Sequence, residues 1–121
     1  MNNSYILLRH AHSKFSSDDF NRTLSEKGFS SLDQLEFLNS FNIDHYFSSP
    51  YKRAFETINS SPIQFDKIVL DNRLRERKLS STFIKDSEFE DSIKYLWQNP
   101  SKSLSEGESN QDALARVLNF L

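Results

Sequence analysis

The chain has 121 residues, which fits a single globular domain over residues 1–121. It has no cysteine, which excludes disulfides, thiolate catalysis and cysteine-ligated zinc, and its formal net charge of -2 provides no field to attract nucleic acid or an anionic membrane. The early apolar run at 5–8 is too short for a signal sequence or a membrane-spanning helix. We therefore expect a cytoplasmic protein that binds neither nucleic acid nor membrane.

The first predicted elements are a strand and a long helix. Ser4–Leu8 is apolar on both faces, as in a buried parallel strand, and a polar loop follows as far as Thr23. Ser25 is the predicted N-cap of an amphipathic helix. In that helix apolar residues recur at every third position, at Phe29, Leu32, Leu35, Leu38 and Phe41.

The next segments alternate between strand and helix patterns. Ile43–Ser48 predicts a second strand, and Phe65–Leu70 predicts a third. Between them Tyr51–Ile58 predicts a helix, with an inner face made of Ala54, Phe55 and Ile58. This alternation predicts an α/β fold with three layers, α/β/α, around a mostly parallel sheet.

Two further helices are predicted in the last third of the chain. Ser87–Gln98 ends at Asn99-Pro100, and Asn110–Leu121 closes the sequence on apolar residues with no C-cap. Gly107-Glu108-Ser109 precedes this last helix and could supply backbone N–H groups to an anion. A last helix that ends on apolar residues without a C-cap suggests an interrupted chain.

Arg9-His10 is the pair that points to chemistry. It follows the first predicted strand, and ligands bind at the carboxyl ends of strands in open α/β sheets. An imidazole there can attack phosphorus while the guanidinium of Arg9 neutralises the phosphoryl oxygens. Arg53, after the second strand, is expected on the same rim of the sheet. Glu76, after the third strand, can protonate a leaving oxygen. Each residue taken alone is more often an ordinary surface or structural residue, so the combination carries the inference.

Five segments together resemble the histidine phosphatase superfamily, the phosphoglycerate-mutase-like proteins. They are Leu8-Arg9-His10-Ala11-His12-Ser13, Leu24-Ser25-Glu26-Lys27-Gly28, Ser48-Ser49-Pro50 with Arg53-Ala54 and Thr57, Arg73-Leu74 with Glu76, and Gly107-Glu108-Ser109. The resemblance implies that His10 becomes transiently phosphorylated. It also implies that Arg9, Ser13 and Arg53 bind the phosphoryl group and that Glu76 donates the proton.

The departures from the family pattern favour a small phosphatase over a mutase. Ala11 replaces the family's usual glycine. Ser16 and Leu79 stand where mutases have an asparagine and a tyrosine. The resemblance implies no metal and no organic cofactor, and the spacing of His10 and His12 gives no metal site.

The family's second histidine, in a His-Gly pair after a fourth strand, has no counterpart after Ser109. We therefore expect a fold that lacks C-terminal strands and a helix, with the edge of 5–8 exposed. An exposed apolar edge favours pairing with another chain, so a homodimer or higher oligomer is expected.

The sequence leaves two functions open. One is a phosphatase that acts on a small phosphorylated substrate or a phosphoprotein through phosphorylated His10, weakened by loss of the second histidine. The other is an inactive remnant that serves as a phosphate-binding or oligomerisation module. Whether the chain is naturally truncated or part of a longer protein also stays open at this point.

Overall fold

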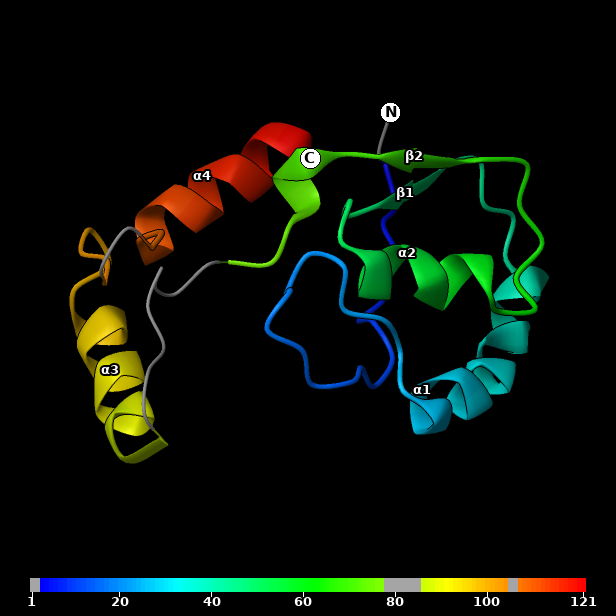
Figure 1. Cartoon of the computed structure of the whole chain (residues 1–121). Coiled ribbons are helices and arrows are strands. Elements are labelled where there is room, and N and C mark those ends of the chain that lie inside the picture. The colour runs from blue at the N-terminus through cyan, green and yellow to red at the C-terminus, as the bar shows by residue number, and fades with distance from the viewer. Residues whose placement is uncertain (1–2, 78–85, 105–106) are drawn as a thin grey trace. The chain divides into compact units, whose positions relative to one another are not determined.

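The computed structural model describes residues 3–77, 86–104 and 107–121 (Figure 1). The chain forms two compact units, Met1–Asn72 and Arg73–Leu121. Leu79, which bears on the distinction from mutases, lies outside the described residues. No helix in the described ranges is long and apolar enough to cross a membrane.

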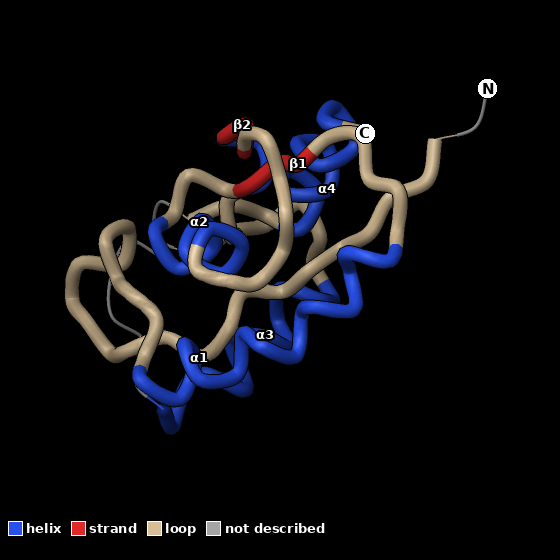
Figure 2. The backbone as a smooth tube through the Cα atoms, turned by 90° about the vertical axis from the view of Figure 1, so that its right-hand side faces the viewer, coloured by secondary structure: helices blue, strands red, loops and turns tan. Residues whose placement is uncertain are grey.

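The first unit contains two strands and three helical segments. In chain order these are α1 (Glu26–Ser31), the 3-10 helix η1 (Leu32–Ser40), β1 (Tyr46–Ser48), α2 (Lys52–Asn59) and β2 (Ile68–Leu70). Helix α2 runs beside the two strands, and α1 lies beyond α2 (Figures 1 and 2). The unit therefore layers helices against one side of the strand pair.

Strands β1 and β2 are parallel, which confirms an α/β fold with a parallel sheet. Tyr46 pairs with Ile68, and Ser48 pairs with Leu70. The N–H of Asp71 then donates to the carbonyl of Ser48 at 2.9 Å, just beyond the last pair. Because α2 connects the strands, this is the strand–helix–strand unit that the alternating pattern predicts.

The prediction of a first strand over Ser4–Leu8 is wrong. Within the described residues the sheet has two strands, and 3–12 is in neither. The apolar side chains from Tyr5 to Leu8 are exposed, Leu7 by 88%. A parallel strand apolar on both faces is stable only when a ladder and two covering layers surround it. Here no such ladder forms.

The long helix predicted from Ser25 begins where expected. The Ser25 hydroxyl accepts the N–H of Gly28 at 3.0 Å, which is an N-cap. After Ser31 the chain continues as the 3-10 helix η1 over nine residues. A 3-10 helix has three residues per turn, so the strict three-residue apolar spacing suits it better than an α-helix. Leu32 and Leu38 are its buried residues.

The inner face predicted for α2 is wrong in detail. The buried residues of this helix are Arg53 and Thr57, while Ala54, Phe55 and Ile58 are only half-buried. Arg53 and Thr57 are four positions apart and therefore share one face of the helix. Polar loops cover this face and bind it through hydrogen bonds, which explains why it is polar.

The second unit contains two α-helices, α3 (Asp86–Gln98) and α4 (Asn110–Phe120), as the sequence predicts. A short 3-10 helix, η2 (Asn72–Leu74), spans the boundary of the two units. Ser109 caps α4 by accepting the N–H of Asp112 at 3.0 Å. The side chain of Asn110 donates to the carbonyl of Leu96 on α3 at 2.8 Å, which joins the two helices.

A largely buried ion pair fixes residues 73–77 to the start of α4. The Arg116 guanidinium donates to both carboxylate oxygens of Glu108, at 3.0 and 2.7 Å, and to the carbonyls of Arg73 and Arg75 at 2.7 and 2.8 Å. Arg77 donates to the Glu108 carbonyl and to the side chain of Asn110. Backbone carbonyls before Glu76 and the Arg77 side chain after it are therefore held by α4 and by Glu108 just ahead of that helix.

Replacing Arg116 with methionine is expected to destabilise the second unit by on the order of 3 kcal/mol, because it leaves the Glu108 carboxylate without its main partner. Hydrogen exchange should show the loss in 73–77 and in α4. Lys94→Met, which breaks the exposed pair with Glu90, is the control and should cost less than about 1 kcal/mol. Equal effects of the two substitutions would contradict a stabilising role for Arg116.

Candidate active site

His10 is half-buried, and its ring hydrogen bond determines which nitrogen can react. Nδ1 lies 2.7 Å from the carbonyl oxygen of Ala11. A carbonyl oxygen only accepts hydrogen bonds, so Nδ1 must carry the proton. In the neutral ring this leaves the lone pair on Nε2, which is the atom available for nucleophilic attack.

The loop that carries His10 is attached to α2. The N–H of Ala11 donates to Thr57 Oγ1 at 3.0 Å, and the Thr57 hydroxyl donates to the carbonyl of Arg53 at 2.8 Å. Arg53 precedes Thr57 by four residues, or about 6 Å along the helix axis. The residue that follows His10 is thereby held about one turn from Arg53.

The same loop packs tightly against the start of α1. The N–H of Ser25 donates to the carbonyl of His12 at 2.9 Å, and His12 Nδ1 lies 2.6 Å from the Ser25 hydroxyl. A Cβ added to Gly28 would overlap the His12 carbonyl oxygen. Only glycine permits this approach at position 28.

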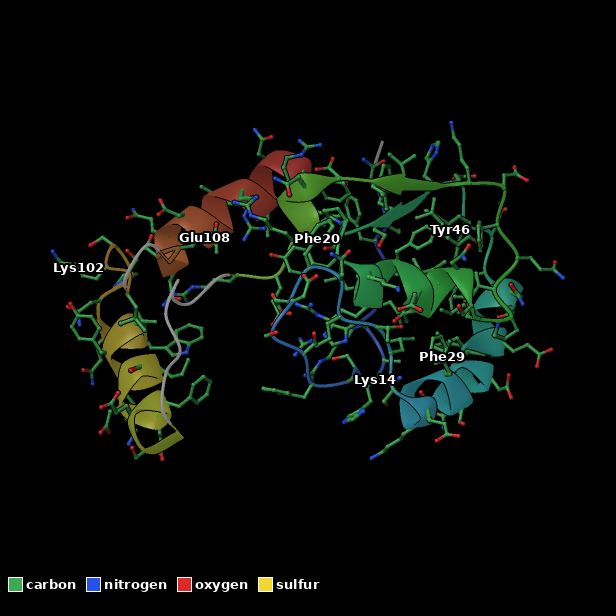
Figure 3. The ribbon with its side chains drawn as sticks, in the orientation of Figure 1. Lys14, Phe20, Phe29, Tyr46, Lys102 and Glu108 are labelled. Atoms are coloured by element: carbon green, nitrogen blue, oxygen red, sulfur yellow. The ribbon has the colours of Figure 1, made fainter. Side chains whose placement is uncertain are left out.

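Ser13 begins a loop whose two ends are joined. Ser13 forms an isolated antiparallel bridge with Leu24, and the N–H of Lys14 donates to the carbonyl of Thr23 at 2.9 Å. The Thr23 hydroxyl contacts both carboxylate oxygens of Glu56 on α2, at 2.6 and 2.9 Å. Figure 3 labels Lys14 at this closed base and Phe20 at the end of the loop near α2.

Arg53 is the most buried charged residue of the first unit, with 2% of its surface exposed. Its Nη1 donates to the carbonyl of Asp19 at 2.8 Å and lies 3.2 Å from the Asp19 carboxylate. The Arg53 guanidinium also lies over the ring of Tyr51, 4.8 Å from the ring centroid. The buried guanidinium thus has a carbonyl, a carboxylate and an aromatic ring among its contacts.

Two residues near Arg53, Asp19 and Arg22, were not identified from the sequence. Arg22 contacts the same Asp19 carboxylate at 3.4 Å. Its Nε is buried and has no hydrogen-bond partner within the part of the chain that the structure describes. Both residues lie in a polar loop without periodicity, so only their shared position near Arg53 identifies them.

The turn before Arg22 has its own acidic residue. Asn21 donates to the Asp18 carboxylate from its side chain at 3.0 Å and from its backbone N–H at 3.3 Å. These two hydrogen bonds, the side-chain one first, lower the pKa of Asp18 below its ordinary value. The Asp18 carboxylate thus closes the turn that contains Asp19.

The remaining predicted site residues are Arg9, Ser13 and Glu76. Arg9 is exposed and directly precedes His10, and Ser13 is half-buried. Glu76 is exposed and belongs to the second unit, on the segment that Arg116 and Arg77 hold to α4. Among the described residues, no group of three His, Cys, Asp or Glu side chains could hold a metal ion.

Comparisons with known proteins identify the family and the fold. The model of the histidine phosphatase superfamily (branch 1) matches residues 5–121. The fold resembles a mycobacterial glucosyl-3-phosphoglycerate phosphatase, with a TM-score of 0.70, 18% identity and coverage of 92% of this chain and 58% of that one. It also resembles an Escherichia coli K-12 protein assigned as an alpha-ribazole-5'-P phosphatase, with a TM-score of 0.70, 18% identity and coverage of 93% and 62%. The chain therefore spans less than two thirds of either structure's length. A comparison with curated proteins gives no match.

Proposed function

We propose that this chain, because it belongs to the histidine phosphatase superfamily, hydrolyses a phosphomonoester through a phosphorylated His10. The observation that carries the proposal is the hydrogen bond from His10 Nδ1 to the Ala11 carbonyl. It fixes the tautomer in which Nε2 is the nucleophile. The substrate is a small phosphorylated molecule or a phosphorylated protein side chain.

In the first step, His10 Nε2 attacks phosphorus, and the bond between phosphorus and the ester oxygen breaks. The ester oxygen takes up a proton and leaves as the alcohol, and we assign Glu76 as the donor of that proton. In the second step, water attacks the phosphorus of phosphorylated His10 and the bond between phosphorus and Nε2 breaks, which releases inorganic phosphate and restores the neutral ring. The proton that Glu76 lost returns from this water.

The cations of the first unit stabilise the phosphoryl group in this scheme. Arg9 and Arg53 neutralise the equatorial oxygens, and the Ser13 hydroxyl donates a further hydrogen bond. We add Arg22 to this set because its buried Nε lacks a partner among the described residues and because it shares Asp19 with Arg53. A phosphoryl oxygen would supply the acceptor that this N–H needs.

The test compares this chain with His10→Ala in hydrolysis of para-nitrophenyl phosphate and in binding of inorganic phosphate. Turnover that the substitution abolishes supports the phosphatase. His10→Ala should still bind phosphate because the arginines remain. Phosphate binding without turnover by the unmodified chain would indicate the alternative function, a phosphate-binding module, and would refute the enzyme.

We also propose that copies of the chain associate through the segment from Tyr5 to Leu8. Four consecutive apolar side chains are exposed there, and such a run pairs readily with a second copy. Light scattering at micromolar concentration should show a dimer or higher oligomer, and Leu7→Lys should shift it toward the monomer. Phe37→Lys, at an exposed position in η1, is the control and should leave the mass unchanged. A stable monomer of the unmodified chain would refute the association.

A further inference from the structure

Two aromatic rings lie beside the buried arginine of the candidate site. The Tyr51 ring contacts the Arg53 guanidinium, and the Phe20 ring packs edge-on against Tyr51 with a centroid distance of 5.2 Å and an interplanar angle of 63°. Phe20 is nevertheless 49% exposed. The contacts therefore run from a buried cation through one ring to a second ring that faces solvent.

The backbone holds Phe20 in this position. The N–H of Lys52, at the start of α2, donates to the carbonyl of Phe20 at 3.0 Å. The neighbouring Asp19 carbonyl accepts from Arg53 at 2.8 Å. Two hydrogen bonds in succession thus fix the end of the loop to α2. Phe20 is therefore a constrained side chain that keeps half of its surface in water.

Such a ring is well suited to ligand binding. An ordered aromatic side chain loses little conformational entropy when a second ring packs on it, and an aromatic pair contributes beyond the area it buries. Phe20 and Tyr51 adjoin the cation that receives the phosphoryl group in the proposed reaction. A group attached to that phosphate would lie next to these rings.

We propose that the phosphomonoester carries an aromatic alcohol, whose ring packs against Phe20 and Tyr51 while Arg53 binds the phosphate. This inference rests on the proposed function for the placement of the phosphate. The leaving alcohol is then a phenol, either as a small aryl phosphate or as a phosphorylated tyrosine in a peptide. Both sources share the flat apolar ring and the phosphate attached to it.

The experiment measures binding of phosphonates, which the chain cannot hydrolyse, by calorimetry. Phenylphosphonate should bind more tightly than methylphosphonate by roughly 2- to 12-fold, the range that one aromatic contact provides. Phe20→Ala should remove this difference without weakening methylphosphonate binding. Phe37→Ala, which removes an exposed ring elsewhere in the first unit, should preserve it.

Equal binding of the two phosphonates, or a preference that survives Phe20→Ala, would overturn the inference, and so would no binding of either. If the chain binds phenylphosphonate preferentially but hydrolyses no phosphomonoester, the proposed enzyme is refuted and the ring preference is not. Failure of the proposed function and failure of this inference are therefore distinguishable. Binding of a peptide that contains phosphonomethyl-phenylalanine distinguishes a phosphorylated tyrosine in a protein from a small aryl phosphate. Tighter binding of the peptide than of phenylphosphonate indicates a protein substrate, and equal binding indicates a small aryl phosphate.

Discussion

Arg53→Lys is expected to slow hydrolysis of para-nitrophenyl phosphate by about 100- to 1,000-fold, the usual cost of losing one preorganised donor to a reacting group. Lysine keeps the charge but loses the planar fork that reaches two acceptors at once. In this structure one nitrogen of the fork, Nη1, already contacts both the Asp19 carbonyl and the Asp19 carboxylate. The lysine ammonium group has fewer N–H donors and cannot donate to both Asp19 and a phosphoryl oxygen in the geometry that arginine allows.

The measurement is kcat and KM for both proteins, with inorganic phosphate binding as a second readout. Phosphate affinity should fall together with turnover because Arg53 contacts the phosphoryl group throughout the reaction. Lys52→Ala is the matched control, since Lys52 is the exposed neighbour of Arg53 and its backbone N–H is unchanged. If Arg53→Lys retains turnover within threefold, Arg53 is not a phosphate ligand.

Gly28→Ala is expected to be the most disruptive small substitution in the first unit. The new methyl group would overlap the His12 carbonyl oxygen, so α1 or the His10 loop must move. Overpacking of this kind costs about 1–3 kcal/mol, and more where backbone rather than a side chain obstructs the methyl group. Movement of the loop also strains the hydrogen bond from the Ser25 N–H to the His12 carbonyl. It displaces the backbone at His12, which is two residues from His10.

Thermal denaturation should report the loss of stability, and phosphate binding should report the displaced loop. Ser30→Ala, at an exposed position of α1, is the control and should be neutral or slightly stabilising, since alanine is the better helix former. If Gly28→Ala unfolds at the same temperature as Ser30→Ala, the close approach at His12 contributes nothing to stability.

The sequence predicted the elements whose signals are local. Ser25 is predicted to cap a helix because it precedes an apolar repeat, and this cap is confirmed. The parallel pairing of β1 and β2 follows from the strand–helix–strand order and is also confirmed. Each of these features depends on residues that are close in the chain, or on connection rules that need only the order of elements.

The predictions that were wrong concern features that depend on long-range contacts. The apolar run from Tyr5 to Leu8 has strand composition, but strand composition does not supply a partner. In α2 the apolar residues indicated the wrong inner face, because loop residues such as Asp19 bind the polar face that holds Arg53 and Thr57. Arg22 was missed for the same reason. What identifies Arg22 is a buried N–H that has no hydrogen-bond partner among the residues the structure describes, and no sequence pattern indicates this.

The hydrogen-bonded chain from Ala11 through Thr57 to Arg53 has a mechanical consequence. The loop that carries His10 and the buried Arg53 are attached to the same turn of α2, so a rigid displacement of that helix moves both of them together. The distance between Ala11 and the Arg53 backbone then stays constant while the rest of the unit moves. The Thr57 hydroxyl is the group that links these two partners.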